Sequence, residues 1–445
     1  MKIKKNELIA ALNAAKLFIP TKTSFERLKY CLIDGPAGKI FATDNETTAI
    51  ISIGIIGATR MLEAEEMPEI VFPDDDFRAD LTALKTDQLK SLAEYAGIAG
   101  IDMPGEKKTT KAAIVDMIFA ASVASAEAEK AKVLPAVEVG ERFCVKPCDL
   151  LKIVNSLEGK PDDLIDLSVD EFNYEGSLLE TAQAYSLSVG ENFQKLIVQP
   201  ASDFPEIPVF DENIPLLDIN GADLESVAMI LNPTHDNMTA HILLLDVENQ
   251  AIVGCDIKRL HMLKHPISKL EGVEKISLPG KVAQAVCKIE KKTISMAINT
   301  DKTWVSMTAG NVCIHTQPMD LDYPKYQQLV SEVPVHAVII QKEKMLSAIK
   351  QASLVLDEGF GAKMGFNGGL TVGAEGKRGQ YIQENVPFEK GKIEPAVNMR
   401  FNPRFVQDAL SCMGEKVKLA LHNEESPLFF YKGKEFTALI MPTMA

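Results

Sequence analysis

Two groups of side chains have the types and the spacing that metal chemistry would use. His261 and His265 are four residues apart, as in a metal-binding pair on one helix face, but no glutamate lies between them. Asp74, Asp75 and Asp76 are consecutive carboxylates, which point in different directions and most often form a solvated loop. We therefore expect no metal site and no cofactor.

Motifs for nucleophilic catalysis and phosphate binding are missing from the sequence. It contains no Walker-type phosphate loop, no GxSxG nucleophile turn and no HExxH pair. The seven cysteines show no CxxC spacing, which argues against a disulfide scaffold or a zinc ribbon, and Cys144 and Cys148 are interpreted as core packing. The sequence predicts a protein that is not an enzyme and that works in a reducing compartment.

Lysines gather on one proline-led segment, LPGKVAQAVCKIEKK (278–292). Lys281, Lys288, Lys291 and Lys292 could attract phosphates without reading bases, which gives salt-sensitive, sequence-independent binding. The alternative is that they are only the solvated side of an amphipathic helix.

The same pattern occurs twice more, at VKPCDLLKIVNSL (145–157) and FNPRFVQDALSCM (401–413). Apolar residues recur at the third, seventh and tenth positions after each proline, which is helical spacing with proline in the first turn. Strand-like runs precede and follow each segment. A second series of helices is expected at 4–18, 220–231 and 341–356, each followed by a strand, a turn and another strand.

Six variants of one β-α-β-β-β unit are thus predicted, and they pair into three domains, 1–209, 210–333 and 334–445. The fold class is α+β. Such repeats are typical of closed or stacked assemblies. The helical parts of the six segments, taken as 4–16, 147–157, 221–231, 279–292, 341–353 and 403–413, carry a net charge of +5, whereas the rest of the chain carries −20. A weakly cationic helical face on an acidic protein is the consequence.

The chain of 445 residues is 46% hydrophobic, yet no apolar run approaches the length of a membrane span. The amphipathic N-terminal segment does not fit a signal peptide. We expect a cytoplasmic protein that has no membrane partner.

The sequence resembles the bacterial DNA polymerase III beta subunit, the sliding clamp. The resemblance is carried by ATDN (42–45), SDFPEIP (202–208), GCDIKRLHML (254–263), DYPKYQQLV (322–330) and SPLFFYKGKEFTALIMP (426–442). It implies a divergent, bacterial, phage-encoded or mobile-element-encoded clamp. It further implies a head-to-tail homodimer that closes a ring around double-stranded DNA, with the helices lining the hole. A DNA polymerase and a clamp loader would bind through short peptide motifs.

The resemblance also implies two sets of site residues. The peptide cleft, between the second and third domains, would use Arg259, Leu260, Pro324, Gln328, Leu329, Pro427, Met441 and Pro442. By the alternative interpretation, Leu439 and Met441 are plain core residues of a C-terminal strand. The expected DNA contacts are Lys22, Lys146, Lys152, Lys281, Lys288, Lys342 and Arg404. The family's usual Gly-His before Arg-Leu is Ile257-Lys258 here, and Gln328 stands where a basic residue is common.

The first domain is predicted to carry an insertion at 60–138. Its segment 80–121 resembles the helix-extended-helix modules of SAP and LEM-like type, in which Lys107, Lys108 and Lys111 could contact nucleic acid. A protein-interaction hairpin or spacer is an equally good interpretation.

Two other functions remain open from sequence. One is a nucleic-acid-processing enzyme that the inserted module targets to DNA, and the other is a DNA-binding scaffold that never closes. The sixfold repeat favours a clamp, because an enzyme has no reason to keep it.

Overall fold

The computed structural model describes residues 1–20, 22–56, 115–116, 118, 142–174, 182–189, 195–207, 213–331, 334–356, 361–376 and 379–443. By their contacts the residues form a small unit (Met1–Lys2, Asp34–Gly38 and Ile55–Arg142) and a large one (Ile3–Ile33, Lys39–Gly54 and Phe143–Ala445). The repeated elements belong almost entirely to the large unit. Most of the predicted insertion at 60–138, with Asp74, Asp75, Asp76, Lys107, Lys108 and Lys111, lies outside the described residues.

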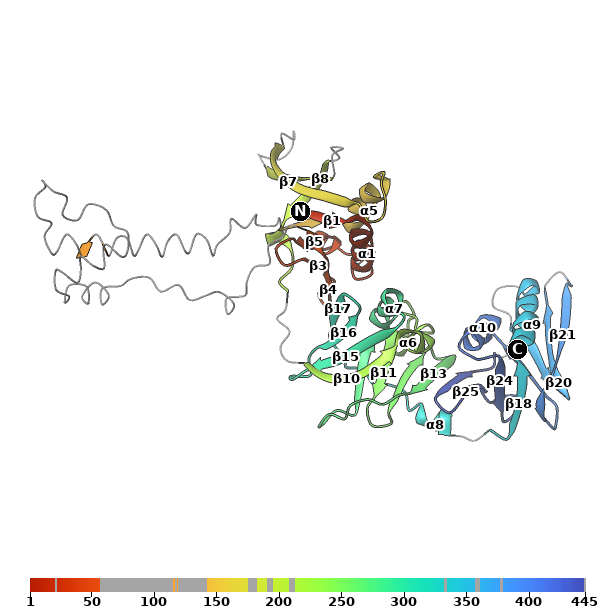
Figure 1. Ribbon diagram of the computed structural model, residues 1–445. Helices are drawn as coiled ribbons and strands as arrows, with labels where there is room; N and C mark the ends of the chain where they lie inside the picture. The colour runs from red at the N-terminus through yellow and green to blue at the C-terminus, as the bar shows by residue number, and fades with distance from the viewer. Residues whose placement is uncertain are drawn as a thin grey trace, which may run out of the picture. The chain divides into compact units, whose positions relative to one another are not determined.

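The predicted repeat is confirmed, because the described elements follow one another as six β-α-β-β-β units (Figure 1). The first two units are β1 (Lys2–Lys4), α1 (Lys5–Lys16), β2 (Cys31–Asp34), β3 (Lys39–Thr43), β4 (Thr47–Ser52), and then β6 (Arg142–Val145), α5 (Pro147–Ser156), β7 (Leu164–Tyr174), β8 (Ala182–Val189), β9 (Lys195–Pro200). The next two are β10 (Asn213–Asn220), α6 (Gly221–Ala228), β11 (Ile242–Asp246), β12 (Ala251–Cys255), β13 (Arg259–Lys264), and then β14 (Lys275–Pro279), α7 (Gly280–Ile289), β15 (Thr293–Asn299), β16 (Val305–Ala309), β17 (Val312–Thr316).

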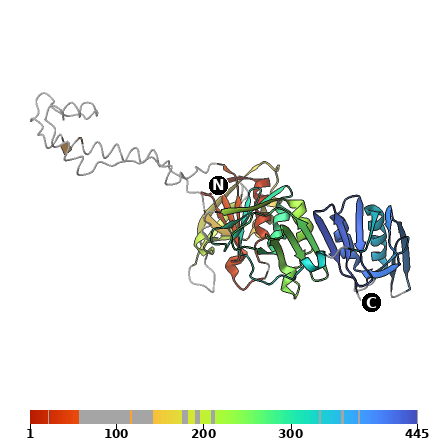
Figure 2. The same ribbon diagram turned by 90° about the horizontal axis from the view of Figure 1, so that it is seen from below.

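The last two units are β18 (His336–Gln341), α9 (Lys342–Val355), β19 (Ala362–Phe366), β20 (Gly369–Glu375), β21 (Tyr381–Pro387), and then β23 (Val397–Phe401), α10 (Pro403–Ser411), β24 (Lys416–Leu421), β25 (Leu428–Lys432), β26 (Phe436–Ile440). Short elements outside the units are β5 (Ile55–Ile56), α8 (Gln327–Ser331) and β22 (Lys390–Lys392). α9 packs against β20 and β21 (Figure 2).

Consecutive units are interlocked by an exchange of their first strands. β10 pairs with β15 of the following unit, and β14 of that unit pairs with β11. β18 and β24, and β23 and β19, repeat this arrangement near the C-terminus. Because neither unit of a pair completes its own sheet, backbone hydrogen bonding requires both units to fold together.

The helices begin where the sequence predicts, with one difference. Pro147 and Pro403 occupy the first turn of α5 and α10, as expected. Pro279 instead ends β14 and caps α7, which begins at Gly280 and ends at Ile289. Val282 and Val286 are buried, so the apolar face is the predicted one.

Gly280 marks a close approach between α7 and the chain before β11. A Cβ at this position would lie 2.7 Å from the carbonyl oxygen of His241, which is a backbone atom and cannot rotate away. A glycine is therefore required here by space and not by its torsion angles.

We predict that Gly280→Ala lowers the free energy of unfolding by about 1–3 kcal/mol, because the added methyl group forces α7 away from His241. Gly414→Ala is the matched control, since a Cβ there meets no atom within 4 Å. Thermal melting of the full chain measures both. Equal melting temperatures for the two variants would contradict the prediction.

Candidate functional site

Two strand pairs join successive pairs of units, and we call them seams. In the first seam β4 pairs antiparallel with β17, with α1 and α7 on either side. In the second seam β13 pairs antiparallel with β26, and α6 and α10 meet through Met229 and Cys412. The seams correspond to each other, because each joins the last strand of one unit to the last strand of a later one. At each seam the two strands would otherwise be exposed edges, and their pairing satisfies the backbone groups of both.

Arg259 holds the second seam on its helical face. Its side chain is 9% exposed, and its Nε donates to Asp256 Oδ2 at 2.6 Å, while Nη1 pairs with Asp408 of α10. Its guanidinium lies 4.3 Å from the ring centroid of Phe405. A buried guanidinium needs such partners, because an uncompensated charge in the interior is costly. Arg259 is thus a structural tie between β13 and α10.

The opposite face of the second seam is an apolar cluster. Leu260 and Met262 on β13 lie in it with Leu439 on β26 and Phe429 on β25. Tyr326 is buried against this cluster, and Tyr323 and Val330 are partly buried against it. The segment that leads into α8 therefore covers the seam from outside.

Asp246, at the end of β11, fixes this covering segment. Its carboxylate is fully buried and accepts hydrogen bonds from Tyr326 Oη at 2.8 Å and from Gln327 Nε2 at 3.2 Å. Asn249 donates to it through its backbone and its amide nitrogen. Burial raises the pKa of Tyr326, so its hydroxyl stays protonated and donates at neutral pH.

The residues predicted for the peptide cleft fall into three environments. Leu260 and Pro427 are buried, Met441 and Pro442 are half-buried, and Pro324, Gln328 and Leu329 are exposed on the covering segment. The Met441 amide donates to the Lys258 carbonyl at 2.8 Å, which extends the strand pairing of the second seam. Leu439 belongs to the core, as the alternative interpretation expected, while Met441 is only half-buried. The sequence reasoning missed Tyr323, Tyr326 and Asp246, although two aromatic residues in DYPKY were a usable signal.

The predicted DNA contacts differ in how much of their charge is available. Lys146 pairs with Glu26 at 2.9 Å, Lys152 with Asp149 at 3.0 Å and Lys281 with Asp44 at 2.6 Å. Lys342 donates to the carbonyls at the end of α10, including Met413 O at 2.9 Å. Within the described part of the chain, Lys22, Lys288 and Arg404 have no such partner, and the same holds for Lys16 and Lys350, which were not predicted.

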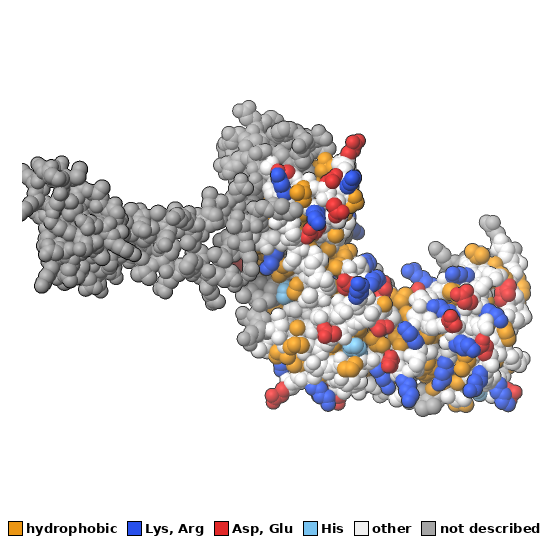
Figure 3. Space-filling view, viewed as in Figure 1, with side chains coloured by type: hydrophobic (Ala, Val, Ile, Leu, Met, Phe, Trp, Pro, Cys, Tyr) orange, Lys and Arg blue, Asp and Glu red, His pale blue; other side chains and the backbone are white. Residues whose placement is uncertain are grey.

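Charges of both signs share the surface of the large unit. On the face in view in Figure 3, lysine and arginine side chains are interspersed with aspartate and glutamate. Hydrogen bonds from Lys29 and then from Lys146 lower the pKa of Glu26 to about 2, and the pairing with Glu26 raises the pKa of Lys146. Both groups are therefore charged at neutral pH and largely neutralise each other. The cationic character of the helices rests on the unpaired side chains.

His261 and His265 do not face a common point. His261 Nδ1 donates to the Ser226 carbonyl of α6 at 2.6 Å, whereas His265 Nε2 lies 2.9 Å from the Asp218 carbonyl. His261 Nε2 is buried without a hydrogen-bond partner among the described residues. Burial lowers the pKa of His261 to about 4, so the ring is neutral in the folded protein. Among the described residues, no cluster of three or more acidic, histidine or cysteine side chains could hold a metal ion.

We predict that His261 destabilises the protein at acidic pH. Its pKa rises from about 4 when folded to about 6.5 when unfolded, so stability falls as the pH drops through 6.5 toward 4, by about 2 kcal/mol between pH 7 and pH 5. His261→Gln should lose this component, whereas His265→Gln should keep it. Melting temperatures at both pH values measure the effect, and an unchanged pH dependence in His261→Gln would refute it.

Comparisons with known proteins agree with this fold. No family model matches the chain. The beta sliding clamp of Helicobacter pylori is 25% identical over 272 residues, which are 57% of this chain and 70% of that protein. The DNA polymerase sliding clamp of Bacillus subtilis superposes with a TM-score of 0.69 at 14% identity, covering 100% of this chain and 98% of the other. The sliding clamp of Pseudomonas aeruginosa bound to griselimycin gives a TM-score of 0.66 at 14% identity, covering 100% and 99%. By sequence and fold together, the chain is a divergent relative of the beta sliding clamps, the beta subunits of DNA polymerase III.

Proposed function

We propose that this chain is a DNA sliding clamp, a non-catalytic processivity factor that encircles duplex DNA and tethers a DNA polymerase. The observation that carries the proposal is the sixfold repeat with its interlocked pairs and its two equivalent seams. A chain of repeats joined edge to edge has a free edge at each end, and pairing of those edges between two copies would close it. Topological closure then supplies processivity without a tight DNA site.

A head-to-tail homodimer fits the free edge of β21. Among the described strands, β21 has β20 as its only neighbour, although β21 is the last strand of its unit, as β4 and β13 are of theirs. An exposed edge of this length invites pairing with another chain. A third and a fourth seam, made between two copies, would use it.

Sequence-independent DNA contact is assigned to the unpaired cations of the helices. Lys288 on α7, Arg404 on α10, Lys16 on α1 and Lys350 on α9 occupy four of the six repeated helices, and Lys22 follows α1. Few and dispersed cations bind the phosphate backbone weakly, which lets a ring slide. Lys146, Lys152 and Lys281 would have to leave carboxylate partners to contribute, and Lys342 would have to leave the end of α10.

The partner cleft is assigned to the outer face of the second seam. Of the predicted residues, Leu260 belongs to the apolar cluster, Leu329 presents an aliphatic side chain that is 42% exposed on α8, and Arg259 lies on the opposite, helical face of the seam. An apolar patch beside a polar rim suits a short peptide of a polymerase or a clamp loader. Gln328 and Lys258 would then shape which peptides bind.

None of the described helices combines the length and apolar character that a membrane crossing needs. We place the protein in the cytoplasm, where a clamp would meet chromosomal DNA. Most of the inserted module lies outside the described residues, so neither the enzyme nor the open-scaffold alternative gains an observation in its favour.

We predict that analytical ultracentrifugation of the full chain gives a particle of about twice the chain mass of 48.7 kDa. On a nicked circular plasmid it should resist high salt, because a closed ring cannot dissociate by losing phosphate contacts, and linearising the plasmid should release it. Gel filtration with the plasmid measures retention. A monomer, or equal retention on both forms of DNA, would overturn the proposal.

We predict that griselimycin, which is bound in the Pseudomonas structure, also binds this chain and that Leu329→Asp weakens it by about tenfold or more. Leu354→Asp is the matched control, since Leu354 is 86% exposed at the end of α9. Isothermal titration calorimetry measures both affinities. An equal loss of griselimycin affinity in the two variants would contradict the cleft assignment but would leave the ring proposal unaffected.

A further inference from the structure

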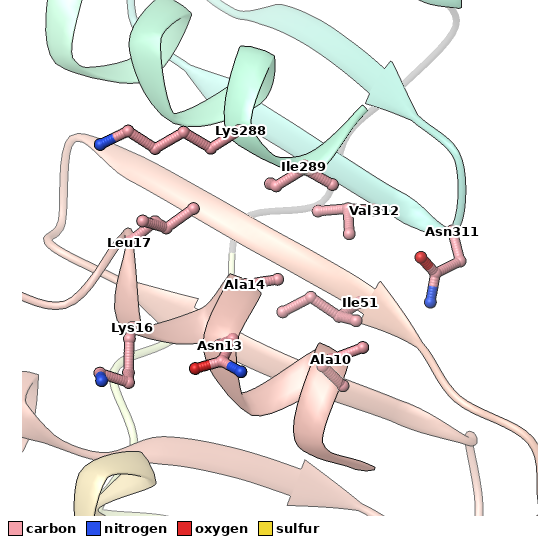
Figure 4. A pocket seen from close by; sticks show the side chains of 11 residues that line it. Ala10, Asn13, Ala14, Lys16, Leu17, Ile51, Lys288, Ile289, Asn311 and Val312 are labelled. Carbon is pink, nitrogen blue, oxygen red and sulfur yellow. The ribbon is translucent and has the colours of Figure 1, made fainter. Parts of the chain in front are cut away.

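A cavity of about 560 Å³ lies at the first seam, between α1 and α7. Figure 4 shows its lining: Ala10 and Ala14 of α1 lie opposite Ile289 at the end of α7, with Ile51 of β4 and Val312 of β17 between the helices. Its volume is typical of a site for a small organic molecule. Both sides of the seam contribute walls.

At the corresponding helix positions of the second seam, two sulfur atoms meet. Met229 is the ninth residue from the start of α6, and its Sδ lies 3.6 Å from Sγ of Cys412, nine residues after Pro403. Asn13 is the ninth residue from the start of α1, and Lys288 lies nine residues after Pro279. Both of these polar residues line the cavity. The first seam thus replaces a packed pair with two polar side chains around a space.

Corresponding positions on β4 and β13 also differ in side-chain size. Asn45 and Ile257 both have a positive φ, of 76° and 75°, two residues before the first residue of β4 and of β13. In this register Ala49 of β4 corresponds to His261 of β13. His261 reaches α6 through its hydrogen bond to the Ser226 carbonyl, whereas the corresponding residue of the first seam is the short side chain of Ala49. The two seams therefore differ in side-chain size on the strand as well as on the helices.

The cavity has apolar walls and a cationic edge. Ala10, Ala14, Ile51, Ile289 and Val312 provide apolar walls. Lys16 and Lys288 point to the same side of the cavity, with Leu17 between them (Figure 4). Within the described residues, neither ammonium group has an ion pair or a hydrogen bond, so both can receive an anion.

We propose that this cavity binds a small amphipathic anion, with an aryl or alkyl body against the apolar walls and a sulfonate or carboxylate between Lys16 and Lys288. A DNA phosphate would use the two lysines but would leave the apolar walls unfilled. Because the walls come from both sides of the seam, the ligand stabilises the first seam and raises the melting temperature. It also neutralises two of the helix cations assigned to DNA.

The test uses the full chain and the dye 8-anilinonaphthalene-1-sulfonate, followed by fluorescence and calorimetry. We expect one site per chain. Ala14→Met should abolish binding by filling the cavity, and Ala10→Leu, at an exposed position, repeats the test if overpacking makes the first variant unstable. Lys288→Met should weaken binding about tenfold, whereas Lys350→Met, which removes an unpaired lysine on α9, should not.

Two outcomes would overturn the proposal. Unchanged binding in both cavity-filling variants would place the dye elsewhere on the surface. Loss only in Lys288→Met, together with displacement of the dye by inorganic phosphate, would mean a phosphate contact without an apolar site. Neither outcome affects the sliding-clamp proposal, because DNA retention is measured separately on the same variants.

Discussion

Strand exchange between neighbouring units is the constraint on which the rest of this structure depends. β10 completes the sheet of the following unit through β15, and β14 completes the sheet of the preceding one through β11. Each strand has backbone groups that must be paired when buried, so an isolated unit would leave one sheet without a strand. This exchange also brings the helices of the two units together, since α6 packs against α7 and α9 packs against α10.

The two seams use one backbone geometry with different side-chain chemistry. Antiparallel strands meet in both, yet the second is tied by a buried Arg259 between Asp256 and Asp408, and the first by Lys281, whose side chain is 46% exposed, at Asp44. A surface ion pair contributes little, whereas breaking a buried one is costly. The first seam, with its cavity, is accordingly the less tightly packed joint.

Part of the positive charge on the helices is already engaged in interactions within the protein. Lys342 caps the carbonyl end of α10, where a cation also complements the helix dipole. Lys152 and Asp149 neutralise each other within α5. The positive charge left for a polyanion is therefore smaller than a count of lysines suggests, which suits a surface that must slide and not grip.

The sequence by itself determined the six units, the starts of α5 and α10, and the apolar faces of the helices, because these depend on periods of two and 3.6 residues and on proline chemistry within each segment. Only the tertiary structure decided which strand completes which sheet, since β4 and β17 pair across more than two hundred residues that no local pattern links. It also decided that Lys146 is paired and Lys288 is not, and that Tyr326 is anchored by Asp246. Those outcomes depend on which side chains approach each other in space, and distances between remote residues are not encoded in any single segment.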